Sequence, residues 1–313
     1  MARVLNRWSH IKTLSLIWFF FTITFYSLLR MALFNSSRNS PSEDLTVNIV
    51  ANDSRARLYD KMTRDLHDNG ALFLKQGETS QSLSLTDIFD LKDGSIISIL
   101  KAADPPVRAN VLYLSPEQSF PISAAVRDIF LPSFNKVIWF QNSSVYHFSM
   151  YHASHHIVPV PATDTEIEAE ANAVRAVAET VCPLNIVLDR VVLTSTGVVL
   201  GCWQVLSGTD PVTIRAKLKT ALPRSPAKQL YDNVMLHTSF ARLLGHPNTY
   251  PPEGDKTSEL KFFDELVTRA NKRLTGIQAT ITELWYVEEY DVLALALNGR
   301  MKARKFRLGC SKA

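Results

Sequence analysis

Residues 146–151 read Tyr-His-Phe-Ser-Met-Tyr, and residues 236–241 read Leu-His-Thr-Ser-Phe-Ala. Each stretch sets a histidine and a serine two positions apart among apolar residues, which predicts a half-buried β-strand. Alternate side chains of a strand point to the same face. The two pairs that share a face are therefore His147 with Ser149, and His237 with Ser239. Tyr151 follows at the same spacing, and we expect it beside the first pair, lining the substrate site.

Two such strands facing each other across a cleft would bring together two imidazoles and two hydroxyls. This set suits the hydrolysis of a phosphoester without a metal ion. One neutral histidine takes a proton from water, and the other, protonated, gives one to the leaving oxygen. The hydroxyls donate hydrogen bonds to the phosphate oxygens. The motifs do not show which histidine is the base and which is the acid. The competing interpretation is that two His-x-Ser triplets occur by chance in a chain with eight histidines.

The segment between the two motifs predicts alternating helices and strands. A helix begins at Thr163-Asp164, strands over 184–193 and 198–206 form a hairpin, and a helix follows over 209–221. Further strands are expected over 279–288 and 290–297. Helices that separate antiparallel strand pairs indicate an α+β fold with two similar lobes.

The layout resembles the two-histidine (2H) phosphoesterase superfamily, including its plant-type cyclic phosphodiesterases and RNA ligase-like proteins. Its members carry two His-x-Thr/Ser motifs in two pseudo-symmetric lobes around a central cleft. Residues 237–243, His-Thr-Ser-Phe-Ala-Arg-Leu, match the second motif well. The resemblance covers residues 107–308, and the chain departs from the usual pattern by having serine at both hydroxyl positions.

The resemblance implies an enzyme that opens a cyclic phosphodiester, such as a 2′,3′-cyclic nucleotide, with no cofactor and no metal. His147 and His237 would be catalytic, and Ser149 and Ser239 would bind the phosphate. A non-catalytic binding or scaffold module of the same fold is the alternative. A glycosyltransferase is a third, weaker candidate, because the sequence lacks an Asp-x-Asp motif.

Residues 13–29 contain no charged side chain and span roughly 26 Å as a helix. With residues 31–34 they predict a transmembrane signal anchor over 13–34. Three basic residues precede it, which favours a cytosolic tail over 1–12 and a luminal body in the endoplasmic reticulum or Golgi. A cleaved signal peptide fits less well, because no small-residue cleavage site follows.

The body is divided at Pro105-Pro106 into a stem or linker over 35–104 with some local structure, such as a short helix over 57–69, and a phosphoesterase-like domain over 105–310. Three sequons agree with a luminal body and predict glycosylation at Asn35, Asn52 and Asn142. The chain carries a net charge of +4, but 29 basic and 30 acidic residues lie from Glu43 onward. The body is thus slightly acidic, and a stable complex with nucleic acid is not expected.

The remaining candidates have simpler interpretations. Cys182, Cys202 and Cys310 allow one disulfide and one free thiol, or three buried thiols. His152, His155 and His156 lack nearby acidic residues, so a metal site is not favoured. Arg242 is expected on the opposite strand face from His237, in a salt bridge.

Overall fold

The computed structural model describes residues 41–75, 82–92, 95–248 and 256–310. The chain divides into two compact units, residues 1–47 and 48–313. The described part of the first unit, 41–47, is the start of helix α2 (Pro41–Asn69). The predicted cytosolic tail, the membrane segment 13–34 and Asn35 lie outside the described residues. Within the described residues, no helix is long and apolar enough to cross a membrane.

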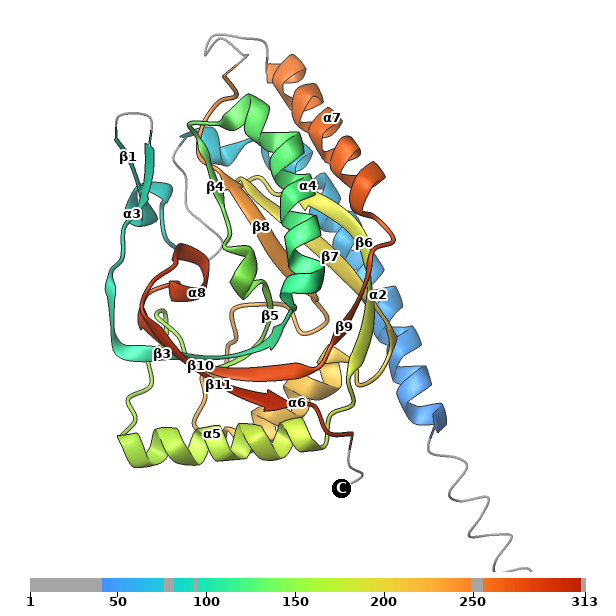
Figure 1. Ribbon diagram of the computed structural model, residues 1–313, viewed down its shortest axis with the longest axis vertical. Helices are drawn as coiled ribbons and strands as arrows, with labels where there is room; N and C mark the ends of the chain where they lie inside the picture. The colour runs from blue at the N-terminus through green and yellow to red at the C-terminus, as the bar shows by residue number, and fades with distance from the viewer. Residues whose placement is uncertain (1–40, 76–81, 93–94, 249–255, 311–313) are drawn as a thin grey trace, which may run out of the picture. The chain divides into compact units, whose positions relative to one another are not determined.

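The second unit contains a four-stranded antiparallel sheet in the order β11-β10-β3-β5. Helices α5 (Asp164–Glu179) and α6 (Pro211–Ala221) pack against it (Figure 1). Its strands are β3 (Ala102–Tyr113), β5 (His147–Ser154), β10 (Glu283–Asp291) and β11 (Met301–Arg307).

A five-stranded antiparallel sheet has the order β4-β8-β7-β6-β9. Helices α4 (Pro116–Phe134) and α7 (Lys256–Leu274) pack against it and against each other (Figure 1). Its strands are β4 (Ile138–Phe140), β6 (Leu184–Leu193), β7 (Val198–Ser207), β8 (His237–Leu243) and β9 (Gln278–Ile281). The predicted α+β class with antiparallel sheets is confirmed.

Short elements complete the described structure. Strands β1 (Phe89–Lys92) and β2 (Ser95–Ser98) form a separate two-stranded sheet. The short helical turns are η1 (Leu72–Lys75), α3 (Leu85–Ile88), η2 (Ser143–Val145) and α8 (Ala294–Leu297).

Helix α5 begins where the sequence predicts. The Thr163 hydroxyl accepts a hydrogen bond from the Glu166 backbone N–H at 3.3 Å, and the Glu166 carboxylate accepts one from the Thr163 N–H at 2.7 Å. This capping box satisfies backbone donors that the first helical turn leaves unpaired. Ile167, Ala171 and Val174 then follow at helical spacing and are buried, so the cap and the apolar stripe together define the helix.

The C-terminal strand pair expected over 279–288 and 290–297 does not form. Strand β9 joins the five-stranded sheet beside β6, whereas β10 crosses into the four-stranded sheet between β3 and β11. Residues 294–297, Ala-Leu-Ala-Leu, form the turn α8 instead. They contain no β-branched residue, so they have little preference for a strand. The chain therefore links the two sheets directly.

Pro105 and Pro106 lie inside β3 and not at a boundary. Glu289 of β10 pairs with Val107, and Asp291 pairs with Ala102, so the intervening residues of β3 have no partner in β10. A proline removes a backbone donor, and an irregular stretch of a ladder tolerates that loss.

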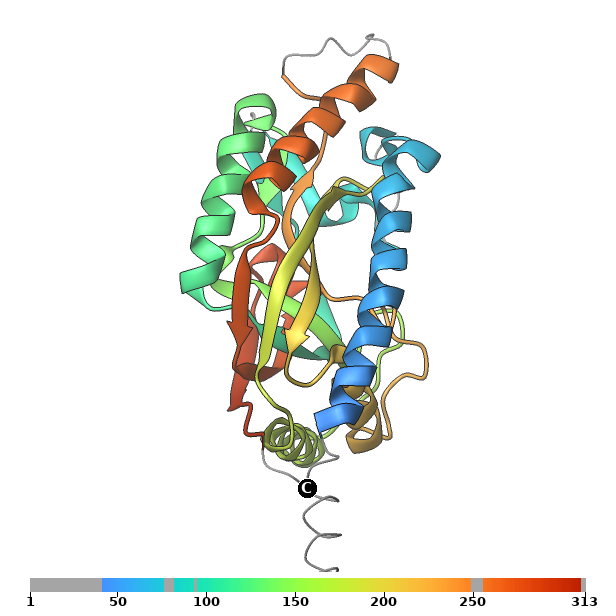
Figure 2. The same cartoon turned by 90° about the vertical axis from the view of Figure 1, so that its right-hand side faces the viewer.

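The stem expected over 35–104 differs from the structure at residues 48–69, which pack against the five-stranded sheet as the main part of α2 (Figure 2). Arg55 forms a fully buried ion pair with Asp210 at 2.9 Å. The Tyr59 hydroxyl lies 2.9 Å from the Trp203 carbonyl and 2.7 Å from the Leu236 carbonyl, and it accepts from the Leu236 N–H at 3.1 Å. These polar anchors, with few apolar residues between them, explain why the periodicity was too weak to predict this contact.

Two of the three cysteines are paired. Cys182, just after α5, forms a disulfide with Cys310 near the C-terminus, and Cys202 is a buried free thiol. Of the two arrangements that the sequence allowed, the structure has one disulfide and one free thiol.

The Tyr59 hydroxyl provides a test of how α2 contributes to stability. In Tyr59→Phe, backbone groups of Trp203 and Leu236 lose a buried partner, which we expect to lower the free energy of unfolding by about 1–3 kcal/mol. Urea denaturation of the full chain measures this loss. Tyr290→Phe, at a half-buried tyrosine outside α2, is the matched control and should change stability by less than about 0.5 kcal/mol. Equal stability of both variants would contradict the role given to Tyr59.

Candidate active site

A cavity of about 480 Å³ lies between the two sheets. Strands β3, β5 and β10 line it from one sheet, and β7 and β8 line it from the other. Leu58, Met62 and Asp65 of α2 also reach it, as do the hairpin residues 194–196 and the loop before β8. The site thus depends on elements from most of the second unit, including α2.

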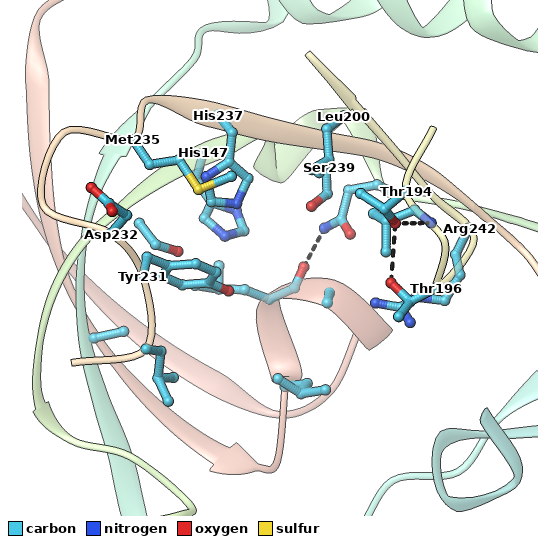
Figure 3. Close-up of a pocket in the computed structure, with 18 of the residues that line it drawn as sticks. His147, Thr194, Thr196, Leu200, Tyr231, Asp232, Met235, His237, Ser239 and Arg242 are labelled. Atoms are coloured by element: carbon cyan, nitrogen blue, oxygen red, sulfur yellow. Dashed lines mark hydrogen bonds between the residues drawn. The ribbon is translucent and has the colours of Figure 1, made fainter. Parts of the chain in front are cut away.

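All four motif residues line this one cavity. His147 and His237 are the first residues of β5 and β8, and Ser149 and Ser239 follow two positions later on each strand. Figure 3 shows His147 with His237 at one part of the cavity, and Ser239 between His237 and Arg242. The alternation of side chains along a strand therefore predicts the shared face of each His–Ser pair correctly.

Both motif strands contain a β-bulge one residue after the serine. On β5, Val111 pairs with Ser149 and Asn110 pairs with Tyr151, which leaves Met150 as the extra residue. The β8 ladder has the same irregularity at Phe240, between residues 239 and 241. A bulge of one residue reverses which face the following side chains occupy. The third residue after each serine therefore returns to the cavity.

Tyr151 is the first residue that the bulge displaces. It does not line the cavity; its hydroxyl lies 2.7 Å from the Ser225 hydroxyl, and the side chain is buried. The expectation that it lines the substrate site is wrong, because alternation was extended across the bulge. His152 lines the cavity instead.

Arg242 is the corresponding residue on β8, and it also lines the cavity. Its Nη1 atom is buried without a hydrogen-bond partner, and the expected salt bridge is absent from the described residues. Burial lowers the pKa of Arg242 to about 10, so the guanidinium stays charged near neutral pH. Figure 3 shows it near Ser239 and the hairpin residues Thr194 and Thr196. A buried cation with an unused donor is suited to binding an anion.

The ring of His147 is held by its own strand. Its Nδ1 lies 2.8 Å from the Val145 carbonyl oxygen. A carbonyl only accepts, so Nδ1 carries the proton and Nε2 is left for a ligand. Burial lowers the pKa of His147, and the bond to Val145 opposes part of this shift.

His237 has a different environment. Its Nδ1 is buried without a partner, and its ring packs against Tyr231 with 4.9 Å between centroids. Burial, the positive charge of Arg215 and the charge of His147 lower the pKa of His237 to about 3. His237 is therefore neutral across the physiological range.

The histidine cluster after the first motif does not form a metal site. His155 accepts at Nδ1 from the Val158 N–H at 3.2 Å, so its Nε2, 3.1 Å from the Lys228 carbonyl, is the donor. Both nitrogens are thus occupied. Within the described part of the chain, no group of three metal-binding side chains is found. Burial, followed by neighbouring histidines, lowers the pKa of His152 to about 3.

The sequons at Asn52 and Asn142 lie within the described residues, and their asparagine side chains differ in exposure to solvent. The Asn52 side-chain amide donates to the Val205 carbonyl at 2.8 Å, and its oxygen accepts from the Val205 N–H at 3.1 Å. This pairing with β7 makes Asn52 unsuited to carry a glycan in the folded protein, contrary to the sequence expectation. Asn142 lies exposed at the start of η2.

Glu289 is a cavity residue that the sequence analysis missed. It is buried on β10, lines the cavity, and accepts from the Leu295 N–H at 3.1 Å. Burial raises the pKa of Glu289 to about 7. The sequence feature that could have indicated this residue is the pair of acidic residues 288 and 289 inside an otherwise apolar strand.

No family model and no curated protein matches the chain. Among solved structures, it is similar to TT0787 of Thermus thermophilus, with 12% identity over 65% of this chain and 98% of that one and a TM-score of 0.45. It is also similar to E. coli LigT complexed with 3′-AMP, with 12% identity, the same shares and a TM-score of 0.40. A structure described as a phosphoesterase matches at 13% identity, over 65% of this chain and 98% of that one, with a TM-score of 0.37.

At such identities the likeness concerns the fold alone. The chemistry therefore depends on this chain's own residues.

The buried histidines make stability depend on pH. Both His152 and His237 have folded-state pKa values near 3, below the ordinary 6.5. Their stabilising contribution is complete above about pH 6.5 and falls as the pH drops toward 3, by about 1.4 kcal/mol per pH unit for each group. Urea denaturation at pH 7, 6 and 5 measures this slope. His152→Gln should reduce it, and an unchanged slope would refute the neutral buried state of His152.

Proposed function

We propose that this chain is a metal-independent phosphoesterase of the two-histidine type that opens a cyclic phosphodiester. The observation that carries the proposal is the convergence of two equivalent sets of side chains on one cavity. These sets are His147, Ser149 and His152 from β5, and His237, Ser239 and Arg242 from β8. The bulges at Met150 and Phe240 also support two pseudo-symmetric lobes.

The two histidines divide the proton transfers between them. Burial and the charge of Arg215 keep the His237 imidazole neutral, and Nδ1 is its buried nitrogen. Its Nε2 therefore takes a proton from the attacking water as general base. His147, with Nδ1 fixed by Val145, donates its Nε2 proton to the leaving oxygen. An anionic phosphate between the rings favours the protonated form of His147.

The step is a hydrolysis. The water oxygen forms a bond to phosphorus, and the bond from phosphorus to one ring oxygen breaks. The water proton passes to His237, and the proton of His147 passes to the departing oxygen, which becomes a hydroxyl. Ser149 and Ser239 donate hydrogen bonds to the phosphate oxygens. The Arg242 guanidinium balances the negative charge that builds up on them.

The cavity also suggests the size of the substrate. A volume of about 480 Å³ falls in the ordinary range for small-molecule sites. A mononucleotide with a 2′,3′-cyclic phosphate, or a related small cyclic phosphate, is the substrate class that we propose. The near-neutral body gives no reason to expect a stable complex with nucleic acid.

We further propose that residues 13–34 anchor the protein as a single-pass type II membrane protein with a luminal body. The disulfide between Cys182 and Cys310 supports an oxidising compartment such as the secretory lumen. Exposed Asn142 and the sequon at Asn35 remain the proposed glycosylation sites. Protease treatment of sealed microsomes tests this topology, and digestion of the body without detergent would refute it.

A non-catalytic binding module is the second candidate. Burial lowers the pKa of both motif histidines, His147 and His237, and two neutral imidazoles alone would bind a ligand without hydrolysing it. The full chain should therefore be assayed in detergent against a panel of cyclic nucleotides and cyclic phosphates. The readouts are product formation by ³¹P NMR and binding by calorimetry. Turnover supports the enzyme, and binding without turnover supports the module.

Replacing either histidine should abolish most of the turnover. His147→Ala and His237→Ala each remove a proton-transfer group, which is worth about 10²–10⁴-fold in kcat. The double variant should lose far less than the product of the two losses, because the groups act as a unit. Ser149→Ala and Ser239→Ala are matched controls in the same strands and should lose less. Chelators should have no effect. Full activity of either histidine variant would reject the mechanism.

Arg242 should contribute mainly through its charge and its fork of donors. Arg242→Gln removes the cation beside the phosphate, and we expect a loss of about 10²-fold or more in kcat/KM. Arg242→Lys keeps the charge but not the planar geometry, so it should lie between Gln and the wild type. Steady-state kinetics on the cyclic substrate measures both. A salt bridge to a carboxylate would instead predict loss of stability with kcat/KM unchanged.

A further inference from the structure

Arg215, on α6, is a buried cation outside the cavity lining. It is 5% exposed and donates four hydrogen bonds, all to backbone carbonyl oxygens. Nε bonds the Met150 carbonyl at 3.0 Å, and Nη2 bonds the Ser149 carbonyl at 2.9 Å. Nη1 bonds the Asn233 carbonyl at 2.7 Å, and Nη2 also bonds the Met235 carbonyl at 2.6 Å.

These four carbonyls lie in or beside the two motifs. Ser149 is the hydroxyl residue of the first motif, and Met150 is the residue that bulges out of its strand. Asn233 and Met235 lie just before His237 on the irregular segment that leads into β8. One guanidinium thus spans from the bulge of one sheet to the start of the motif strand in the other.

A second buried arginine holds the same segment without making this connection. Arg55 of α2 donates to the Val234 carbonyl at 2.7 Å, and its charge is balanced by the ion pair with Asp210. Arg215 differs in two respects: it reaches the first motif, and its donors are all directed at neutral oxygens. Among the described residues, no carboxylate is hydrogen-bonded to Arg215, so its positive charge is balanced less than that of Arg55.

We propose that Arg215 is a positioning residue that fixes the spacing of the two His-x-Ser motifs. This inference rests on the proposed function. The geometric part follows from the four hydrogen bonds, because losing them would free both the bulge at Met150 and the backbone before His237.

The charge of Arg215 has a second effect, on the protonation of His237, in addition to its positioning role. After burial, the charge of Arg215 is the largest influence lowering the pKa of His237, followed by His147 of β5. Tyr231 packs on the ring, and Cys202 of β7 lies opposite in the ladder. Asp232, His152, Arg242 and Glu289 line the same cavity. Removing the Arg215 charge should therefore raise the pKa of His237.

Two variants separate the geometric and electrostatic effects. Arg215→Lys keeps the charge but loses the fork of donors, whereas Arg215→Gln loses both the charge and most of the donors. We expect kcat to fall by about 10²-fold in both variants, with a smaller change in KM, because the reacting groups are misplaced. Only Arg215→Gln should move the acidic limb of the kcat/KM profile, by about one pH unit toward higher pH.

Arg55→Lys is the matched control, because it alters a buried arginine on the same segment but retains a cation beside Asp210. It should lower the melting temperature and leave the acidic limb in place. Wild-type kcat in a folded Arg215→Lys would overturn the positioning role. An acidic limb in Arg215→Gln identical to that in Arg215→Lys would overturn the electrostatic role. If Arg215→Gln does not fold, the kcat of Arg215→Lys still decides the positioning role.

Titration of the imidazole signals by NMR separates this inference from the proposed function. It reports the pKa of His237 in wild type and in Arg215→Gln whether or not any substrate is turned over. A wild type without phosphoesterase activity, but with the expected rise of the His237 pKa in the variant, would refute the enzyme and keep the electrostatic role of Arg215. An unchanged pKa in an active enzyme would do the reverse.

Discussion

The backbone of residues 233–236 is held in place by side chains from outside the segment. Buried carbonyl groups must be paired, and this segment is neither helix nor strand. Arg215 and Arg55 donate to three consecutive carbonyls, and Tyr59 with the Trp203 N–H holds Leu236. His237 follows immediately. The position of one catalytic candidate therefore depends on helices α2 and α6, which themselves contribute no proton-transfer group.

The same dependence explains which parts of the site could be predicted from the sequence. The pairing of a histidine with a serine two residues later follows from the geometry of a single strand, and the structure places both pairs in the cavity. The positions of Tyr151 and Arg242 depend on a bulge, which is set by the register with the neighbouring strand. That register involves residues 110–111 and 199–200, far from each motif in the chain. Local alternation could not reveal it.

The fold shows the same division between local and distant causes. Helix α5 has its cap and apolar stripe within sixteen residues, so the sequence predicts it well. Helix α2 has instead a buried arginine whose partner, Asp210, is 155 residues away. In the sequence, a charged residue with no nearby partner looks like part of a solvent-exposed stem. Only the tertiary structure reveals its ion pair. The crossing of the chain from β9 to β10 also has a distant cause. It depends on the strands that β9 and β10 pair with, β6 in one sheet and β3 in the other.

The two catalytic candidates are alike in sequence but not in environment, and the proposed division of acid and base rests on this difference. Burial lowers the pKa of His147, but a carbonyl acceptor holds its Nδ1, opposes part of this shift and leaves Nε2 for a ligand. His237 has a buried nitrogen without a partner and a nearby guanidinium, and both disfavour a second proton. A general acid and a general base need opposite protonation states at the same pH. In the proposed mechanism two equivalent imidazoles would compete for one proton, and the Val145 carbonyl, which keeps Nδ1 of His147 protonated, makes His147 the proton donor.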